Sequence, residues 1–139
     1  LAVNYYSEII ISQCKEYERE FGVRIIYSKE DSPLGTGGPL ALAEKYLRGS
    51  SFFVMNSDIC CNADLDAMKR TYAESDYLAT IMTYPVDDPT KYGLIKINGD
   101  GITSFIEKPK TRGEEAGPWI INAGIYIFSD EVLNYIQLR

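Results

Sequence analysis

Five short segments of the chain carry residue types that can act on a phosphorylated ligand. They combine glycines, carboxylates, lysines and an amide side chain, and in chain order they are Pro33–Leu40, Asn56–Asp58, Lys91–Gly93, Glu107–Pro109 and Asn122–Gly124. The chain contains no histidine, which excludes nucleophilic schemes with a histidine base and metal sites with histidine ligands. Its chemistry must therefore rely on carboxylates, lysine, arginine, backbone amides or a hard cation bound by oxygen.

The first segment reads Pro-Leu-Gly-Thr-Gly-Gly-Pro-Leu from Pro33 to Leu40. Glycines let backbone amides approach a ligand closely, and the helix expected from Pro39 favours an anion or a polar base edge at its N-terminus. The spacing matches neither the dinucleotide-binding pattern G-x-G-x-x-G nor a phosphate loop followed by Lys-Ser/Thr. A strand-to-helix turn that merely requires small residues is the alternative interpretation.

The second segment places Asp58 after the apolar run 51–55, which is typical of a central strand buried on both faces. Because ligands of parallel sheets gather at the carboxyl ends of the strands, Asp58 is well placed to hold a divalent cation. A helix cap or a loop acid is the alternative. Asp64 and Asp66 have the spacing of the D-x-D metal motif of glycosyltransferases, but they suit the first turn of a helix better.

Each of the remaining segments is weak evidence for a binding site when it is taken alone. The carboxylate of Glu107 can accept two sugar hydroxyls, and Lys108 offers a point charge for a phosphate. Asn122 lies inside a predicted strand and is followed by Ala-Gly, which suggests a bulge or the close approach of a ligand. Tyr92-Gly93 precedes a predicted hairpin. Solvated charges and ordinary turn glycines are the alternative for all of them.

Composition restricts the class of protein further. The formal net charge of −6 argues against nucleic-acid binding. No run of 18 apolar residues and no basic leader occurs, so neither a membrane span nor a secretion signal is expected. The three cysteines, Cys14, Cys60 and Cys61, include an adjacent pair and make a poor disulfide framework. We therefore expect reduced thiols in a cytoplasmic protein.

The hydrophobic periodicity predicts an alternation of helices and strands. Helices are expected at 2–21, 39–47 and 64–74, strands at 23–27, 51–55, 77–84 and 119–128, a hairpin of 94–97 with 102–107, a loop at 109–118, and a last helix capped by Ser129 or Asp130 and running to the end. This order predicts an α/β fold whose mixed, mainly parallel sheet is covered by helices on both faces. No repeat or linker interrupts residues 1–139, so one domain is expected.

In this order, the segments resemble the sugar-phosphate nucleotidyltransferase family, and most of all its mannose-1-phosphate guanylyltransferases of the catalytic (beta) branch. The resemblance covers essentially the whole chain and rests on Glu30-x-x-Pro33 to Leu40, Asn56-Ser57-Asp58, Tyr92-Gly93, Glu107-Lys108-Pro109 and Asn122-Ala123-Gly124-Ile125-Tyr126. It implies a Rossmann-like, GT-A-like fold and transfer of a guanylyl group from GTP to mannose 1-phosphate, which gives GDP-mannose and pyrophosphate. Such chemistry needs alignment and charge neutralisation more than a nucleophilic side chain, which is compatible with the absence of histidine.

The resemblance also implies a role for each segment. The nucleotide is expected to contact Leu34, Gly35, Thr36, Gly37, Gly38 and Asn56. Asp58 is expected to be one of two carboxylates that bind Mg²⁺, and Asp58 and Lys108 are the expected catalytic residues. The sugar phosphate is expected to contact Tyr92, Gly93, Glu107, Lys108, Asn122 and Gly124.

Three departures from the family pattern accompany the resemblance. The glycine-rich loop Gly-Gly-x-Gly-Thr-Arg that contacts the triphosphate does not occur in the chain, and the second metal-binding aspartate is expected beyond Arg139. Gly37 stands where the family has alanine. We therefore expect the chain to be the central part of a nucleotidyltransferase domain, and to transfer no nucleotide by itself.

Several functions stay open at this point. The runner-up is a non-catalytic regulatory subunit of the same fold that senses a sugar nucleotide. A related enzyme for another base or another sugar 1-phosphate is a further alternative, and a metal-dependent glycosyltransferase using Asp64 and Asp66 is the weakest. The resemblance leaves open a homo-oligomer or a regulatory paralogue as the protein partner, and it implies no nucleic-acid or membrane partner.

Overall fold

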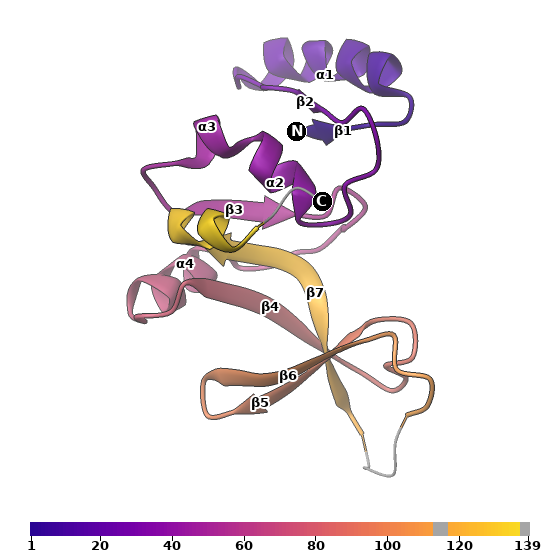
Figure 1. Ribbon diagram of the computed structural model, residues 1–139, viewed down its shortest axis with the longest axis vertical. Coiled ribbons are helices and arrows are strands. Elements are labelled where there is room, and N and C mark those ends of the chain that lie inside the picture. Colours follow the sequence, from indigo (N-terminus) through magenta and orange to yellow (C-terminus); the bar gives the residue numbers. More distant parts are fainter. Residues whose placement is uncertain (113–116, 137–139) are drawn as a thin grey trace. The chain divides into compact units, whose positions relative to one another are not determined.

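A computed structural model describes residues 1–112 and 117–136 (Figure 1). The chain divides into two compact units. The first unit contains Leu1–Ser50 and the segment from Asp130, and the second contains Ser51–Ser129. No helix within the described ranges combines the length and the apolar character that a membrane crossing requires.

The first unit contains two very short parallel strands that pair with each other and are connected in sequence by a long helix. Its elements are β1 (Ala2–Val3), α1 (Ser7–Phe21), β2 (Ser28–Lys29), α2 (Gly38–Leu42), α3 (Glu44–Leu47) and the 3-10 helix η1 (Asp130–Tyr135). Ala2 pairs with Ser28 and Val3 with Lys29. As predicted, α1 ends at Gly22, which has the left-handed φ of 63° that favours glycine at a helix end.

Three predicted boundaries in the first unit are wrong. The helix expected at 2–21 begins only at Ser7, because Tyr6 takes a left-handed φ of 55° and the residues before it pair with β2. The strand expected at 23–27 lies at 28–29, where β1 supplies its partner. The helix expected at 39–47 is divided at Ala43, whose ψ of 1° departs from helical geometry.

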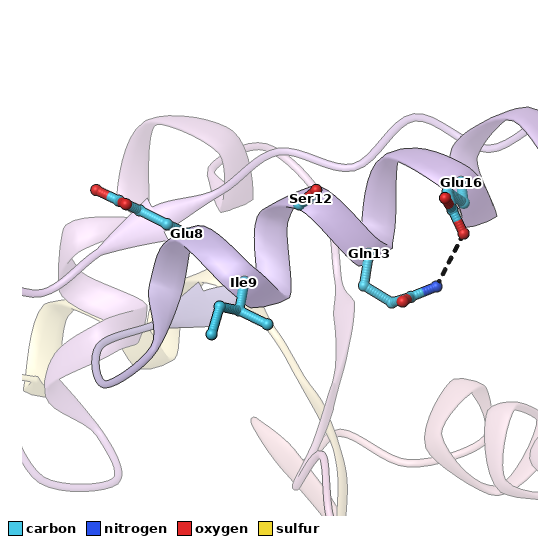
Figure 2. A pocket seen from close by; sticks show the side chains of 5 residues that line it. All are labelled: Glu8, Ile9, Ser12, Gln13 and Glu16. Carbon is cyan, nitrogen blue, oxygen red and sulfur yellow. Dashed lines mark hydrogen bonds between the residues drawn. The ribbon is translucent and has the colours of Figure 1, made fainter.

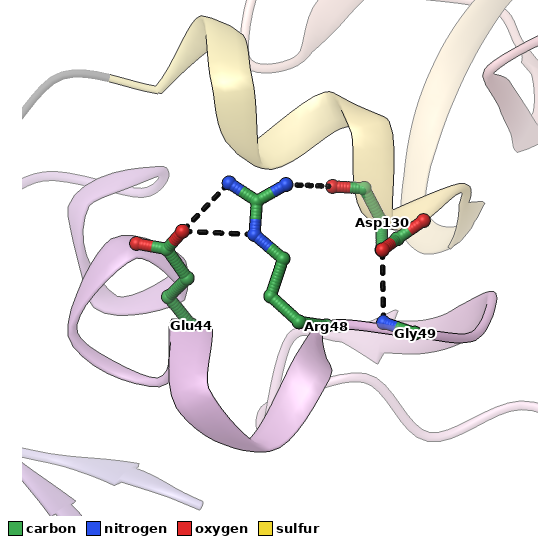
Figure 3. Close-up of polar contacts among 4 residues, drawn as sticks. All are labelled: Glu44, Arg48, Gly49 and Asp130. Carbon is green, nitrogen blue, oxygen red and sulfur yellow. Dashed lines mark hydrogen bonds and ion pairs between the residues drawn. The ribbon is translucent and has the colours of Figure 1, made fainter.

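A polar network ties η1 to α3 within the first unit (Figure 3). Arg48 donates from Nε and Nη2 to Oε1 of Glu44, at 2.8 and 2.6 Å, and from Nη1 to the backbone oxygen of Asp130 at 3.4 Å. The backbone amide of Gly49 donates to Oδ2 of Asp130 at 2.8 Å. The carboxylate of Asp130, predicted as a helix cap, thus accepts a hydrogen bond from another segment. The predicted run of this helix to the chain end falls partly on 137–139, which lie outside the described residues.

The second unit is a five-stranded sheet with one helix packed on it. Its elements are β3 (Phe52–Met55), α4 (Leu65–Ala73), β4 (Ala79–Val86), β5 (Gly93–Asn98), β6 (Gly101–Glu107) and β7 (Trp119–Phe128). β7 is the central strand and has the predicted bounds 119–128. Along one edge it pairs with β4, and along the other with β3 near its C-terminus and with β5 near its N-terminus (Figure 1). The hairpin of β5 and β6 forms where the Asn-Gly-Asp-Gly turn predicts it.

The predicted α/β class is confirmed, but the strands run differently from the prediction. Every pairing within the described part of the five-stranded sheet is antiparallel, and β1 with β2 is the parallel pair. The reason is the insertion of β7 between β3 and β4, which were expected to be parallel neighbours. β3 is also not buried on both faces, since Phe53 and Met55 are exposed while Phe52 and Val54 are half-buried.

The core of the second unit forms where α4 covers β7. Met68 of α4 packs with Ile125 and Ile127 of β7, and these three side chains are buried. Half-buried apolar side chains surround them, namely Ile59, Ala63, Tyr72 and Met82. Because Ile59 belongs to the segment after β3, this core also fixes the loop that carries Asp58.

Candidate functional site

The edge of β7 opposite β4 brings most of the predicted site residues together. β3 ends at Met55, opposite Ile125, and β5 begins beside Ile121 through the pairing of Leu94. The stretch between Ile121 and Ile125 therefore faces the end of one strand and the start of another. The predicted residues that this arrangement gathers in the second unit are Asn56, Asp58, Tyr92, Gly93, Glu107, Lys108, Asn122 and Gly124.

A bulge shapes β7 at the centre of this edge. Ile81 and Thr83 of β4 are two residues apart, but their partners Tyr126 and Asn122 are four apart. Extra residues of β7 are thus looped out at Ala-Gly, which confirms the bulge suggested by the sequence. The side chain of Asn122 stabilises it, because Oδ1 accepts from the amide of Gly124 at 2.9 Å and Nδ2 donates to the hydroxyl of Tyr126 at 2.6 Å.

Gly124 makes room for Asn56. Its φ is +74°, and a methyl group built on its Cα would lie 2.7 Å from Nδ2 of Asn56 and 3.3 Å from Cγ1 of Ile59. The backbone amide of Asn56 donates to the carbonyl of Gly124 at 3.0 Å. The close approach predicted at this glycine is therefore made, in this structure, by a protein side chain, and it fixes the start of the loop that carries Asp58.

Asp58 offers one exposed carboxylate at the end of β3. In the part of the chain that the structure describes, no three acidic or cysteine side chains are grouped so that they could hold a metal ion. A single carboxylate suits Mg²⁺ when phosphate oxygens of a ligand complete the coordination, so the donor set fits a cation bound together with a phosphorylated ligand. Asp64, by contrast, caps α4, since its Oδ1 accepts from the amide of Ala67 at 2.8 Å.

Glu107 is the last residue of β6 and pairs with Gly93, and Lys108 follows it. Gly93 is buried, and a methyl group on it would lie 2.5 Å from Cζ of Phe105 and 3.2 Å from Oε2 of Glu107. The ammonium of Lys108 lies 4.0 Å from Oε1 of Glu107, and both side chains are about two-thirds exposed, at 68% and 64%. An exposed pair at this distance contributes little to stability, which leaves both charges accessible to a ligand.

Lys108 has an unusual backbone. Its φ of 42° is left-handed, although it is neither glycine nor asparagine, and the residue before a proline normally prefers an extended conformation. The amide of Lys108 donates to the carbonyl of Tyr92 at 3.0 Å. The conformation of Lys108 is therefore held by the loop that precedes β5.

Sequence reasoning missed the most perturbed acid of the described residues, Asp88. Its Oδ1 accepts from the hydroxyl of Thr90 at 2.8 Å and from the amide of Thr90 at 3.1 Å, and its Oδ2 accepts from Nη2 of Arg112 at 3.1 Å. The two hydrogen bonds from Thr90, followed by the one from Arg112, lower the pKa of Asp88 to about 2. The pattern Asp-Pro-Thr is a recognisable turn signal, but nothing local points to Arg112.

The glycine loop lies in the first unit and is described by itself. The amide of Leu34 donates to Oε2 of Glu30 at 3.1 Å, and Gly35 has a left-handed φ of 72°. A methyl group on the buried Gly38 would lie 2.4 Å from Cβ of Leu34, whereas one on Gly37 would meet, among the described residues, only Ile136, at 3.9 Å. The loop thus requires glycine at two positions and tolerates a larger residue at Gly37.

A shallow hollow on the surface of α1 contains no predicted site residue (Figure 2). All of its lining residues come from that one helix, and they are Glu8, Ile9, Ser12, Gln13 and Glu16. Gln13 donates to Oε2 of Glu16 at 3.1 Å. Side chains along one face of a single helix do not converge on a ligand, so we assign this hollow no part in function.

Comparison with known proteins agrees with the motifs. Residues 1–139 match the family model described as nucleotidyl transferase. The chain belongs to the nucleotidyl transferase family. This confirms the resemblance seen in the sequence and agrees with the α/β architecture.

Among curated relatives, this nucleotidyl transferase chain is 43% identical to mannose-1-phosphate guanyltransferase 2 of Candida glabrata over 145 residues. It is 41% identical over 143 residues to the protein of Xenopus tropicalis called mannose-1-phosphate guanylyltransferase catalytic subunit beta. Each match covers 100% of the chain and 39% of the relative. The chain therefore spans well under half of the length of these relatives.

The crystal structure of HddC from Yersinia pseudotuberculosis has a similar fold. It superimposes with a TM-score of 0.77 at 31% identity, and the match covers 98% of this chain and 57% of HddC. HddC complexed with GMP-PN matches with a TM-score of 0.75 at 30% identity, over 96% of this chain and 56% of HddC.

Proposed function

We propose that this chain is the central part of a single nucleotidyltransferase domain that transfers a guanylyl group from GTP to mannose 1-phosphate. The products are GDP-mannose and pyrophosphate. The observation that carries the proposal is that the eight predicted site residues of the second unit lie beside the bulge of β7 and at the ends of the neighbouring strands, after β3, at the start of β5 and at the end of β6. The similarity to mannose-1-phosphate guanyltransferases over the whole chain supports the choice of sugar and base.

In this proposal, the sugar phosphate binds beside β5 and β6. The exposed carboxylate of Glu107 accepts hydrogen bonds from sugar hydroxyls, and the exposed ammonium of Lys108 neutralises the phosphate. Gly93 has no side chain and so leaves room for the ring of Phe105 and the carboxylate of Glu107, which places Glu107 beside the sugar. Tyr92, Asn122 and Gly124 complete the proposed sugar-phosphate site. Asn122 and Gly124 contribute mainly by holding the bulge and Asn56 in place.

The nucleotide and the cation are assigned to the other predicted residues. The loop Leu34–Gly38 and Asn56 bind the nucleotide, and the complex of the similar HddC with GMP-PN favours guanine as its base. Asp58 holds Mg²⁺, which supplies charge neutralisation at the phosphates when it is bound. The oxygen of mannose 1-phosphate attacks the α-phosphorus of GTP, and this chain contributes orientation and positive charge rather than a nucleophile.

The proposal extends to partners and location. The relative named catalytic subunit beta supports a regulatory paralogue as partner, with a homo-oligomer as the alternative. Cys14, Cys60 and Cys61 all lie within the described residues and are free thiols, which supports a cytoplasmic protein.

The test is the substrate preference of the product of the gene that contains this chain. Pyrophosphate release would be measured with GTP, UTP and dTTP, each paired with mannose 1-phosphate and with glucose 1-phosphate. The proposal expects the highest kcat/KM for GTP with mannose 1-phosphate. Release with another pair alone would assign the chain to another sugar nucleotide. No release, together with GDP-mannose binding that calorimetry finds independent of Mg²⁺, would instead identify a regulatory subunit.

A matched pair of variants tests the site itself. Glu107→Gln and Asp100→Asn each remove one carboxylate from the same hairpin, at its opposite ends. The proposal expects Glu107→Gln to raise KM for mannose 1-phosphate about tenfold, the cost of losing charge-assisted hydrogen bonds. Asp100→Asn should leave KM unchanged, and equal effects of the two variants would contradict the assigned site.

A further inference from the structure

Two loops flank the hairpin of β5 and β6, and each leads to a residue of the proposed sugar-phosphate site. The first runs from Asp88 to Tyr92 before β5, and the second runs from Lys108 to Arg112 after β6. The backbone of the second loop begins in the left-handed conformation of Lys108. Something must hold this conformation, because side chains other than glycine seldom adopt it unaided.

Two contacts join these loops at both ends. At one end the amide of Lys108 donates to the carbonyl of Tyr92 at 3.0 Å. At the other end Nη2 of Arg112 donates to Oδ2 of Asp88 at 3.1 Å. The two contacts join the loops into a closed ring that contains Lys108, and this restricts the backbone torsions of Lys108 from both sides.

The first loop is itself rigid enough to serve as an anchor. The other oxygen of Asp88 accepts two hydrogen bonds from Thr90, at 2.8 and 3.1 Å. Pro89 is almost completely buried, and its carbonyl accepts from the amide of Tyr92 at 3.0 Å. The two hydrogen bonds from Thr90, together with the one from Arg112, favour the ionised form of Asp88 and lower its pKa to about 2, so the anchor stays charged at neutral pH.

We propose that Asp88 and Arg112 are positioning residues, whose ion pair holds Lys108 in the backbone conformation that presents its ammonium to the sugar phosphate. The inference rests on the proposed function for the role of Lys108. It also gives Arg112 a defined part: because Asp88 neutralises its guanidinium, Lys108 is the cation offered to the ligand. An alternative, in which Arg112 itself binds the phosphate, makes the opposite prediction for the loss of Asp88.

The test compares variants of the product of the gene that contains this chain, at neutral pH. Asp88→Asn retains an oxygen that can accept from Thr90 and removes only the ion pair. Arg112→Gln removes the partner, and Arg112→Lys keeps the charge without the planar fork. Lys110→Gln is the matched control, since it removes one positive charge from the same loop and leaves Asp88 and Arg112 in place.

Two readouts separate positioning from function. Hydrogen exchange at the amide of Lys108 reports how firmly this amide is held by the carbonyl of Tyr92. Calorimetry reports binding of mannose 1-phosphate. We expect Asp88→Asn and Arg112→Gln to speed this exchange and to weaken binding, each about two- to fivefold, as for a partly exposed ion pair. The double variant should be no worse than either single one, and Arg112→Lys should recover part of the loss. Lys110→Gln should leave the exchange rate unchanged.

Each other outcome has one meaning. Unchanged exchange at Lys108 in both Asp88→Asn and Arg112→Gln would overturn the positioning role. Tighter binding in Asp88→Asn would overturn it as well, because a freed Arg112 would then be the phosphate ligand. If exchange is faster in both variants but the unmodified protein does not bind mannose 1-phosphate, the ion pair does hold Lys108 in place. That outcome would count against the proposed function instead.

Discussion

The side chain of Asn56 lies directly over the Cα of Gly124. The amide of Asn56 also donates to the carbonyl of Gly124 at 3.0 Å, so backbone and side chain meet at one point. Two motifs 66 positions apart in the sequence, Asn-Ser-Asp and Asn-Ala-Gly, are therefore one structural feature. The bulge in β7 thus accommodates the start of the loop that carries Asp58.

Replacing Gly124 by alanine should destabilise the chain strongly. The left-handed φ of +74° costs about 1–2 kcal/mol for a residue with a side chain, and the methyl group would lie 2.7 Å from Nδ2 of Asn56. Gly99→Ala is the matched control, because Gly99 has a φ of +58° and open space around it. Urea denaturation should show a larger loss for Gly124→Ala, and equal losses would mean that Asn56 simply moves aside.

The adjacent glycines of the nucleotide loop should respond in opposite ways. Gly38→Ala brings a methyl group to 2.4 Å from Cβ of Leu34, a carbon that cannot move without its backbone, and should lower the midpoint of thermal unfolding. Gly37 has φ −89° and ψ −30°, which alanine adopts readily. Gly37→Ala should therefore be neutral or stabilising by up to about 1 kcal/mol, through the entropy of the unfolded chain. A clear loss of stability in Gly37→Ala would contradict the geometry of the loop.

Local sequence signals were enough to predict the elements whose ends are marked by particular residue types. Strand β7 has the predicted bounds 119–128, because a mainly apolar and aromatic run, interrupted by Asn122 and Gly124, lies between Pro118 and Ser129. The hairpin follows from its Asn-Gly-Asp-Gly turn, and Asp64 lies at the start of α4, as predicted, where it caps the helix. The family resemblance then supplied the predicted site residues, eight of which lie beside the bulge of β7 and at the neighbouring strand ends.

Contacts between distant segments could not be predicted from those local signals. The antiparallel insertion of β7 between β3 and β4 joins segments that are more than 30 residues apart, and periodicity along one segment carries no information about its partner. Strand β1 has only two residues, and its partner β2 follows 25 positions later. The pair of Asp88 and Arg112 was missed for the same reason, since neither residue is unusual among its neighbours in the sequence.

Stability at acid pH should reveal Asp88. Its folded pKa is about 2, below the ordinary value of 3.8, so between these values the unfolded chain binds more protons than the folded chain. The contribution of Asp88 is therefore complete above about pH 4 and is lost as the pH falls toward 2. Urea midpoints measured from pH 5 to pH 2 should fall more steeply for the unmodified chain than for Asp88→Asn. Parallel curves would show that the hydrogen bonds from Thr90 and Arg112 do not persist in solution.

Removal of the carboxylate at position 58 should separate the proposed cation site from the other acids nearby. Asp58→Asn should weaken Mg²⁺-dependent binding of GDP-mannose, measured by calorimetry on the product of the gene that contains this chain, by at least about tenfold, a loss that even an outer-shell partner can cause. Asp66→Asn is the matched control, because Asp66 lies in the first turn of α4, two residues after the cap Asp64. It should leave the dependence on Mg²⁺ intact. If Asp66→Asn abolished that dependence while Asp58→Asn preserved it, the metal would belong to an Asp-x-Asp site of the glycosyltransferase type, and the assignment of Asp58 would be wrong.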